Sequence, residues 1–481
     1  MSTSLIPTSA RTGRRTVVAI GTALALTGLA CSTAAAGTTS PVSSRKAVVG
    51  VGTPSTPGTT PLTPVTPTSG GTALYGETTG APAVAGVTAV ALRTVPVTTT
   101  VALTAALAAA RAGDRIVLAG GTYSGPFDLK ASGTAAHPIV VTPADGASVT
   151  LTSSVPYPGC GATGPDEYRT VSFVGGASHW VVRGLTIRGG LRLSSKNANL
   201  TQNWQAARID DHDWQARRSV PGTTTRDPST TRGLTAWFSA LVGKGVVPSE
   251  DIQLLGNTFT GKGIFGRFAR YATVSGNTVT DIACGTGPAI WFANYSHGNV
   301  FSGNDVSKVA HSTASHYMQE GIRLGNGSDY NVVTGNRVHD LDAAGRGITT
   351  DQDASFNLIT ANVVDNVNIA YNEQQSSWGN VWSYNVANRA NAGFSLRMED
   401  SNLTTPSRDT SSYGTQITCN VVTNSAVAFQ AGAVSGGVFT GNSFSTLSIN
   451  KNLSRYWATE GNRWNGSASV PVSGPTAIAG C

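Results

Sequence analysis

The sequence predicts an all-β protein that folds as a right-handed parallel β-helix with one helix capping its N-terminal end. Gly accounts for 56 of the 481 residues and only 12 % of the residues are charged, a composition typical of short strands joined by tight turns. Short β-branched runs broken by Gly, Pro, Asp and Asn support this fold class. A repeated pattern centred on Asn identifies it as a solenoid.

The Asn repeat is the strongest of these signals. Segments such as LLGNTFTG, TVSGNTVTD and VFSGNDVSK place an apolar residue, a turn residue, an Asn and another apolar residue in the same order. Self-similarity at roughly 20 to 50 residues, without a helix in each repeat, indicates a β-helix. We expect each Asn to bond its copies in neighbouring coils, which satisfies a buried bend. The repeated residues are Asn257, Asn277, Asn304, Asn336, Asn362, Asn385, Asn420, Asn442 and Asn462.

Residues 1–37 form a predicted export signal, with a basic start, a short apolar run at 17–29 and small residues at 34–36. GRRTVV at 13–18 resembles a twin-arginine signal. Cys31 also suggests a lipoprotein, but Gly28 stands where that signal wants a Leu-like residue. The apolar run is too short for a membrane span. We therefore expect a secreted bacterial protein without a transmembrane segment.

Residues 38–98 are predicted to be a Pro/Thr-rich linker, because TPSTPGTTPLTPVTPT cannot bury a core. The β-helix is expected over 99–481. It starts with a helix over 101–114, with a Thr cap before it and Gly113 as its stop. This helix would cover the open end of the stack, where backbone groups are otherwise unpaired.

An insertion at 193–250 interrupts the repeat. Within it, Leu234, Trp237, Phe238 and Leu241 fall on one face of a short helix. The insertion either packs across the outside of the stack or forms one wall of a binding groove.

Charge and cysteine content limit the partners. Without the export signal, which holds three Arg and no acids, the net charge of +7 falls to +4. Mild basicity suits an acidic glycan or serves solubility alone. The sequence contains no Lys/Arg-dense stripe, so nucleic acid is not an expected partner. Two disulfides are expected, with three possible pairings, and we expect a monomer. The four cysteines that follow the export signal are Cys160, Cys284, Cys419 and Cys481.

A second repeat holds the candidate functional residues. The segments KGIFGRF, PAIWFAN, EGIRLGN, RGITTDQD, NIAYNEQ and GFSLRMED align on inward-facing Ile264, Ile290, Ile322, Ile348, Ile369 and Phe394. The next residues then face outward: Phe265, Trp291, Arg323, Thr349, Ala370 and Ser395. Two positions further on, the outward residues are Arg267, Ala293, Gly325, Asp351, Asn372 and Arg397.

These residue types suit an acidic sugar chain, although they also fit a solvated, salt-bridged sheet surface. Arg binds uronate carboxylates through bidentate hydrogen bonds, and Trp stacks on sugar rings. We expect substrate to be bound by Arg267, Trp291 and Arg346. A lyase needs a cation that stabilises an enolate and a base beside it. The expected catalytic residues are Arg323, Arg397, His316 and Tyr317. Oxygen ligands for Ca²⁺ are expected from Asp351, Asp353 and Glu373.

A family resemblance points the same way. Residues 112–190, which include AGDRIVLAGGTYSGPFDLK and WVVRGLTIRGG, resemble the start of the chondroitinase B and alginate lyase family of polysaccharide lyases. This resemblance implies a pectate-lyase-like β-helix that cleaves uronate polymers by β-elimination, often with Ca²⁺. It assigns the catalytic Arg to Arg397. Ser376 stands where the family has its catalytic Lys, and Ile369 and Tyr371 stand where its acidic pair binds Ca²⁺.

The sequence therefore predicts an extracellular, carbohydrate-active β-helix of the polysaccharide lyase type, acting on an acidic polysaccharide. Three alternatives stay open. A non-catalytic glycan- or wall-binding β-helix is favoured by the missing Lys. A glycoside hydrolase could use Asp351 with Glu373 or Glu399 as its pair of carboxylates. A uronate epimerase shares the first step of a lyase. Fold alone does not decide among them.

Overall fold

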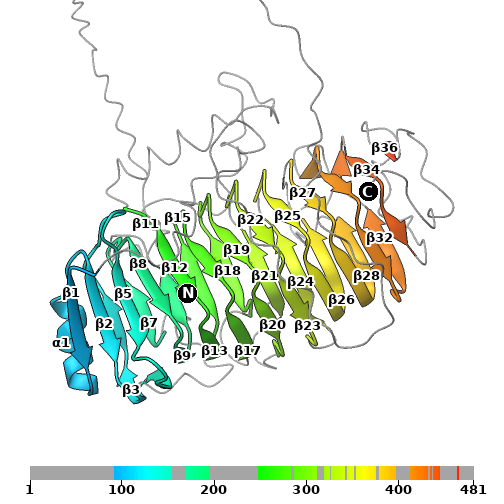
Figure 1. The fold of residues 1–481 in the computed structure, drawn as a ribbon. Helices are drawn as coiled ribbons and strands as arrows, with labels where there is room; N and C mark the ends of the chain where they lie inside the picture. The colour runs from blue at the N-terminus through cyan, green and yellow to red at the C-terminus, as the bar shows by residue number, and fades with distance from the viewer. Residues whose placement is uncertain are drawn as a thin grey trace, which may run out of the picture. The chain divides into compact units, whose positions relative to one another are not determined.

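The computed structural model describes a β-helix built from coils that stack in parallel. The described residues are 91–153, 169–193, 247–282, 287–310, 319–325, 327–341, 344–351, 354–374, 377, 379–396, 412–431, 434–435, 437–444 and 463–464. All of them belong to one compact unit, Thr59–Cys481. Figure 1 shows the successive strands lying side by side along the stack. This confirms the predicted right-handed parallel β-helix.

One wall of the β-helix is a 13-stranded parallel sheet. Each coil of the Asn repeat contributes to it the strand that precedes its Asn. Its strands are β1 (Arg93–Val97), β2 (Asp114–Leu118), β5 (Ile139–Pro143), β8 (Trp180–Arg183), β12 (Ile252–Leu255), β16 (Thr273–Ser275), β19 (Val300–Ser302), β22 (Val332–Thr334), β25 (Leu358–Thr360), β27 (Val381–Ser383), β30 (Gln416–Thr418), β34 (Val438–Thr440) and β36 (Arg463–Trp464).

The other walls form a 19-stranded sheet, whose two outer faces we call the side face and the front face. The side face is made by β3 (Gly121–Gly125), β6 (Val149–Ser153), β9 (Thr186–Arg188), β13 (Thr258–Gly261), β17 (Thr278–Ile282), β20 (Asp305–Ser307), β23 (Arg337–His339), the first parts of β26 (Val363–Glu373) and β28 (Val386–Leu396), β31 (Val421–Thr423) and β35 (Ser443–Phe444). The front face is made by β4 (Phe127–Leu129), β7 (Val171–Phe173), β10 (Leu191–Leu193), β14 (Ile264–Arg267), β18 (Ile290–Ala293), β21 (Glu320–Leu324), β24 (Arg346–Thr350), the last parts of β26 and β28, and β32 (Val427–Ala431).

Two short strand pairs lie outside these sheets. They are β11 (Ser249–Glu250) with β15 (Ala269–Arg270), and β29 (Ser412–Tyr413) with β33 (Val434–Ser435).

The helix α1 (Thr100–Ala108) covers the N-terminal end of the core, as predicted. Its buried Leu103 and Leu107 join the core, and the Thr99 hydroxyl caps the first turn by accepting from Ala102 N at 3.1 Å. The helix is shorter than the predicted 101–114. The carboxylate of Asp114 accepts from Arg111 N at 2.8 Å, which fixes a turn before β2 instead of a further helical turn.

The first strand, β1, was assigned to the linker by the sequence. It pairs in parallel with β2, and its Arg93 donates from Nε to Asp114 Oδ1 at 2.8 Å. Pro96 lies within this strand, which is possible because β1 is the edge of its sheet and an edge strand tolerates a missing amide donor. Folded structure therefore starts inside the predicted linker.

The predicted Asn ladder is present from Asn257 to Asn442. At its centre, the Asn304 backbone N–H and Nδ2 both donate to Asn336 Oδ1, at 3.0 and 2.8 Å, and Nδ2 also donates to Val274 O at 2.9 Å. The residue before each Asn has a positive φ, for example 62° at Gly276. Glycine occurs at five of these eight positions, because L-residues with side chains are strained in this conformation, and the other three are Ala361, Tyr384 and Cys419. Asn462 lies outside the described residues.

A second Asn ladder, which sequence reasoning missed, runs five residues upstream of the first. Asn299 N donates to Asn331 Oδ1 at 2.9 Å, and the same pattern continues to Asn357 and Asn380. The coils that contain Asn299, Asn331, Asn357 and Asn380 thus have two bends whose buried amides bond to neighbouring coils. The signal was visible in GNVFSGN, YNVVTGN, FNLITAN and GNVWSYN, where a second Asn recurs at a fixed distance.

Several predictions fall on other parts of the chain. The export signal, the linker up to residue 90 and residues 194–246 of the insertion lie outside the described residues. Cys419 is disulfide-bonded, and its partner lies outside the described residues. No helix among the described residues is long and apolar enough to cross a membrane.

Candidate functional site

The front face carries the predicted row of outward side chains. Strand pairing sets Phe265 opposite Trp291, Trp291 opposite Arg323, and Arg323 opposite Thr349. In a parallel sheet, residues paired in this way stack in one line across the strands, roughly 4.8 Å apart. These four residues therefore form a continuous row, as the sequence predicted.

The alignment fails at β26, where the expected inward residue was Ile369. Tyr371 takes that position, opposite Ile348 and Phe394. Its ring stacks on Phe394 with centroids 4.9 Å apart, and its hydroxyl donates to backbone carbonyls at 2.9 Å. The outward row therefore continues through Asn372 instead of Ala370, and then through Ser395.

The guanidinium of Arg323 forms the centre of the front face. Arg323 Nη1 donates to Glu320 Oε2 at 2.7 Å, and Nη2 donates to Asp351 Oδ2. Glu320 Oε1 also lies 3.5 Å from Arg346 Nη1. The side chains of Arg323, Glu320 and Asp351 are at most 4 % exposed. Burial lowers the pKa of Arg323, but the charges of Glu320 and Asp351 outweigh this and raise it overall.

An aromatic pair adjoins this charged cluster. The rings of Phe265 and Trp291 are stacked, with centroids 4.6 Å apart and planes inclined by 25°. The Arg267 guanidinium carbon lies 4.7 Å from the centre of the Phe265 ring, and that of Arg323 lies 5.8 Å from the Trp291 ring. Trp291, Arg267 and Arg346 are half-buried, so part of each side chain reaches the surface. The structure thus brings together five predicted site residues, Arg267, Trp291, Arg323, Arg346 and Asp351.

Glu320 was missed by the sequence interpretation, although EGIRLGN contains it. Strict strand alternation places Glu320 and Arg323 on opposite faces. The chain instead turns a corner at Gly321, where an added Cβ would lie 2.4 Å from Val338 Cγ1 and 2.7 Å from Gly347 O. The corner leaves room only for Gly at position 321, and beyond it Glu320 contacts Arg323 and Arg346 on the front face.

Asp351 and Glu373, two of the expected Ca²⁺ ligands, do not form a common site. Asp351 bonds Arg323 on the outer face, whereas the Glu373 carboxylate accepts from Trp382 Nε1 at 2.8 Å and Asn380 Nδ2 at 3.2 Å inside the core. Thr415 also donates to it. Burial raises the pKa of Glu373. The described residues contain no group of three His, Cys, Asp or Glu side chains that could hold a metal ion.

The remaining predicted residues lie outside the described part of the chain. They are Arg397, His316, Tyr317 and Asp353. Their roles, and that of Ca²⁺, stay predictions.

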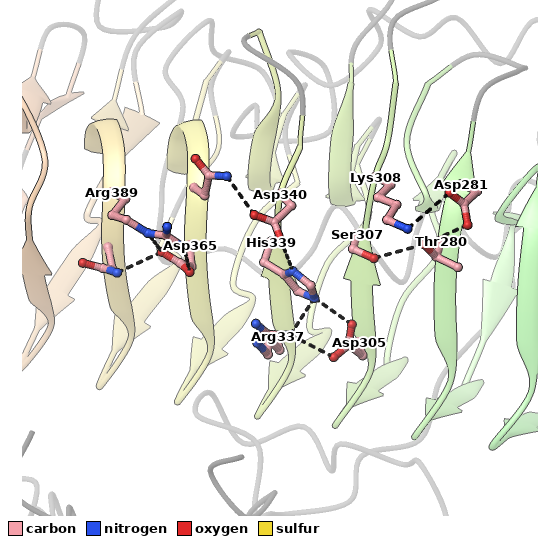
Figure 2. Close-up of polar contacts among 12 residues, drawn as sticks. Thr280, Asp281, Asp305, Ser307, Lys308, Arg337, His339, Asp340, Asp365 and Arg389 are labelled. Atoms are coloured by element: carbon pink, nitrogen blue, oxygen red, sulfur yellow. Dashed lines mark hydrogen bonds and ion pairs between the residues drawn. The ribbon is translucent and has the colours of Figure 1, made fainter. Parts of the chain in front are cut away.

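The side face is also charged, but its side chains pair with one another across the strands (Figure 2). His339 contacts Asp305 Oδ1 through Nε2 at 3.0 Å and Asp340 Oδ2 through Nδ1 at 2.7 Å. Arg389 Nε donates to Asp365 Oδ1 at 2.8 Å. The hydrogen bond to Asp305 is the main cause of the raised pKa of His339. Each side chain labelled in Figure 2 has a partner in this network, which is how a structural surface is organised.

The fold and the front face together define this chain as a parallel β-helix protein with a charged and aromatic outer row. The family model described as periplasmic copper-binding protein (NosD) matches residues 242–393, about a third of the chain. No curated protein sequence matches the chain.

Three of the solved structures with a similar fold are carbohydrate-active enzymes by their names. One is an alginate lyase from Paenibacillus sp. str. FPU-7, at 16 % identity over 74 % of this chain and 99 % of that chain, with a TM-score of 0.45. The GH136 lacto-N-biosidase from Eubacterium ramulus matches at 11 % identity over 75 % and 66 %, with a TM-score of 0.44. The periplasmic alginate epimerase AlgG matches at 14 % identity over 72 % and 67 %, with a TM-score of 0.41.

Proposed function

We propose that this protein is an exported, carbohydrate-active β-helix that cleaves an acidic, uronate-containing polysaccharide by β-elimination on its front face. The observation that carries the proposal is the row of Trp291 and Arg323, with Arg267 and Arg346 on its flanks. Stacked aromatic rings beside guanidinium groups match the two chemical features of a uronate, an apolar ring face and a carboxylate. The disulfide of Cys419 supports export, because disulfides persist in oxidising compartments.

In this proposal the polysaccharide lies across the strands, over the outward row. A half-buried Arg, such as Arg346, binds the uronate carboxylate. A base removes the proton on the carbon next to that carboxylate, the electron pair forms a carbon–carbon double bond, and the bond to the glycosidic oxygen breaks. The leaving oxygen takes its proton from the protonated base or from water. Positive charge near the carboxylate stabilises the enolate that develops. The base is predicted to be His316 or Tyr317.

Glycoside hydrolysis is the second candidate, because Glu320 and Asp351 both bind the guanidinium of Arg323. Each carboxylate is hydrogen-bonded to one terminal nitrogen of the same guanidinium, so the two are neighbours on the front face. A pair of carboxylates at about 5–9.5 Å is the arrangement that glycosidases use. This pair differs from the one expected from the sequence, since Glu320 takes the place of Glu373 or Glu399.

The first test is an ultraviolet assay of the purified mature protein with alginate, pectate, chondroitin sulfate and heparan sulfate. β-Elimination leaves an unsaturated sugar end that absorbs in the ultraviolet, whereas hydrolysis produces reducing ends without that absorbance. We expect rising absorbance on at least one polymer. New reducing ends with a flat ultraviolet trace would refute the lyase and favour the hydrolase, and retention of polymer without either product would identify a binding protein.

Variants locate the activity on the front face. Trp291→Ala and Arg346→Ala are expected to lower kcat/KM by at least tenfold, because each removes a group that contacts the sugar in this proposal. Arg389→Ala is the matched control, since Arg389 pairs with Asp365 on the side face. Loss of activity in Arg389→Ala equal to that in Arg346→Ala would contradict the choice of face.

A further inference from the structure

The front-face row continues beyond Arg323 as a line of small polar side chains. Thr349 lies opposite Asn372, Asn372 opposite Ser395, and Ser395 opposite Gln430. None of these four carries a charge, so the row changes in character from aromatic and cationic over β14, β18 and β21 to neutral and polar over β24, β26, β28 and β32. The consecutive strands are labelled in Figure 1.

One side-chain oxygen of each residue in this neutral row lacks a hydrogen-bond partner within the protein. Thr349 Oγ1, Asn372 Oδ1 and Ser395 Oγ are buried atoms without a partner, and Gln430 Oε1 is a fourth. The side chains of Thr349, Asn372 and Ser395 are fully buried, whereas Gln430 and, at the other end of the row, Trp291 remain half-buried. Trp291 Nε1 also has no partner. A line of such atoms on adjacent strands is unusual, because buried polar groups are nearly always paired.

The side face shows that this sequence can satisfy such positions when they serve structure alone. Thr423 Oγ1 donates to Asn388 Oδ1 at 3.1 Å, and Ser307 Oγ donates to Thr280 Oγ1 at 3.1 Å. These residues stand at outward positions of the same 19-stranded sheet. Thr and Ser hydroxyls at outward strand positions therefore have hydrogen-bond partners on the side face and lack them on the front face.

We infer that Thr349, Asn372 and Ser395 form a run of hydrogen-bonding subsites, one on each successive strand, that bind the hydroxyl groups of neutral sugar residues in the polysaccharide. A hydroxyl supplies both a donor and an acceptor, so it suits the hydroxyls of Thr and Ser as well as the carbonyl of Asn. The strand spacing of about 4.8 Å is close to the length of one sugar unit along a chain that crosses the strands. This inference rests on the proposed function for the direction of the bound chain.

The substrate class follows from the order of the row. A carboxylate-bearing residue binds near Arg323 and Arg346, and the residues beyond it, over Thr349 to Gln430, are recognised through hydroxyls without a second cation. The preferred polymer therefore carries its acidic group at some positions and neutral sugars at others, and a chain with a charge on every residue binds less well.

The test uses a pair of substitutions on each face of the full mature chain. Thr349→Val and Ser395→Ala remove a polar atom without a partner, whereas Thr423→Val and Ser307→Ala remove one that has a partner. Removal of an unsatisfied buried group stabilises a protein, and removal of a bonded one destabilises it. We expect the front-face variants to raise the Tm by about 1–3 °C and the side-face variants to lower it by a similar amount.

Binding is measured by calorimetry with oligosaccharides of alginate, of chondroitin, in which uronate alternates with a neutral amino sugar, and of a neutral glucan. Each front-face variant is expected to weaken binding of the best ligand roughly fivefold, whereas the side-face controls bind like the wild type. Chondroitin fragments are expected to bind more tightly than alginate fragments.

The outcomes separate this inference from the proposed function. A fall in Tm for Thr349→Val and Ser395→Ala would identify ordered water as the partner of these atoms and overturn the inference, as would unchanged binding. Binding to glucan alone, weakened by the same variants, would refute the acidic substrate and keep the neutral subsites. A wild type that binds none of the three overturns both.

Discussion

Replacement of Arg323 by Met tests whether the centre of the front face is a buried ionic cluster. Met has a similar length and no charge, so Arg323→Met leaves Glu320 and Asp351 without the guanidinium that both of them bind. All three side chains are at most 4 % exposed. The two carboxylates are then buried next to an apolar side chain, which raises the free energy of the folded state.

The expected loss can be worked from these contacts. Removing one partner of a buried ion pair costs about 3–5 kcal/mol, because a charge is left buried and uncompensated. Glu320 keeps Arg346, whose Nη1 lies 3.5 Å from its Oε1, so part of its charge stays balanced. We therefore expect the lower end of the range, a loss of about 3 kcal/mol in the free energy of unfolding.

Chemical denaturation, monitored by circular dichroism, measures this loss, and a rescue variant separates charge from packing. The triple variant Arg323→Met, Glu320→Gln, Asp351→Asn removes the buried charges together and is expected to recover most of the stability. Activity should not return, because the cluster also acts on the substrate in the proposed function. A loss below about 1 kcal/mol for Arg323→Met, as is typical of exposed ion pairs, would refute the reasoning.

Three further predictions concern the β-helix itself. Asn336→Leu leaves the two Asn304 donors and the Phe301 carbonyl unpaired, and should cost about 3–6 kcal/mol in the same denaturation assay. Burial raises the pKa of Glu373 above its ordinary 4.5, so the folded state holds this proton more tightly. Stability should then fall as the pH rises from about 4.5 through the raised pKa, and Glu373→Gln should flatten that part of the pH profile. Gly276→Ala should lower the free energy of unfolding by about 1 kcal/mol in thermal melts, because the φ of 62° at this position strains a residue with a side chain. Gly276→Asn should lower it less, because Asn adopts this conformation more readily.

The fold was predictable because its main signal is local and repeated. From Asn257 onward the same short pattern recurs around each repeat Asn, so nine weak signals reinforce one another. The errors arose where the outcome depends on distant partners. The segment NIAYNEQ offers two inward residues of the same parity, Ile369 and Tyr371, and only pairing with β24 and β28 decides between them. The end of α1 likewise depends on Asp114, whose carboxylate bonds residues before and after the helix.

The candidate site was predictable only in part. Period-2 alternation correctly placed Trp291, Arg323 and Thr349 in one outward row. The same rule could not find Glu320, because the corner at Gly321 breaks the alternation. It also could not tell a carboxylate inside the core from one outside it, and Glu373 lies inside because the Trp382 and Asn380 donors satisfy it there.

The front and side faces differ in a way that the backbone does not require. Both belong to one parallel sheet with the same strand spacing, and both carry Thr, Ser, Asn and Arg at outward positions. On the side face these residues bond across the strands, as Arg389 does with Asp365. On the front face, Thr349 and Ser395 have buried hydroxyl oxygens without partners. Such groups lower the stability of the folded state, and a surface that serves structure alone does not need them. Local rules are typically broken at functional sites, and fold alone does not locate them. The unequal satisfaction of two equivalent faces is therefore an argument, independent of any resemblance, for placing the function on the front face.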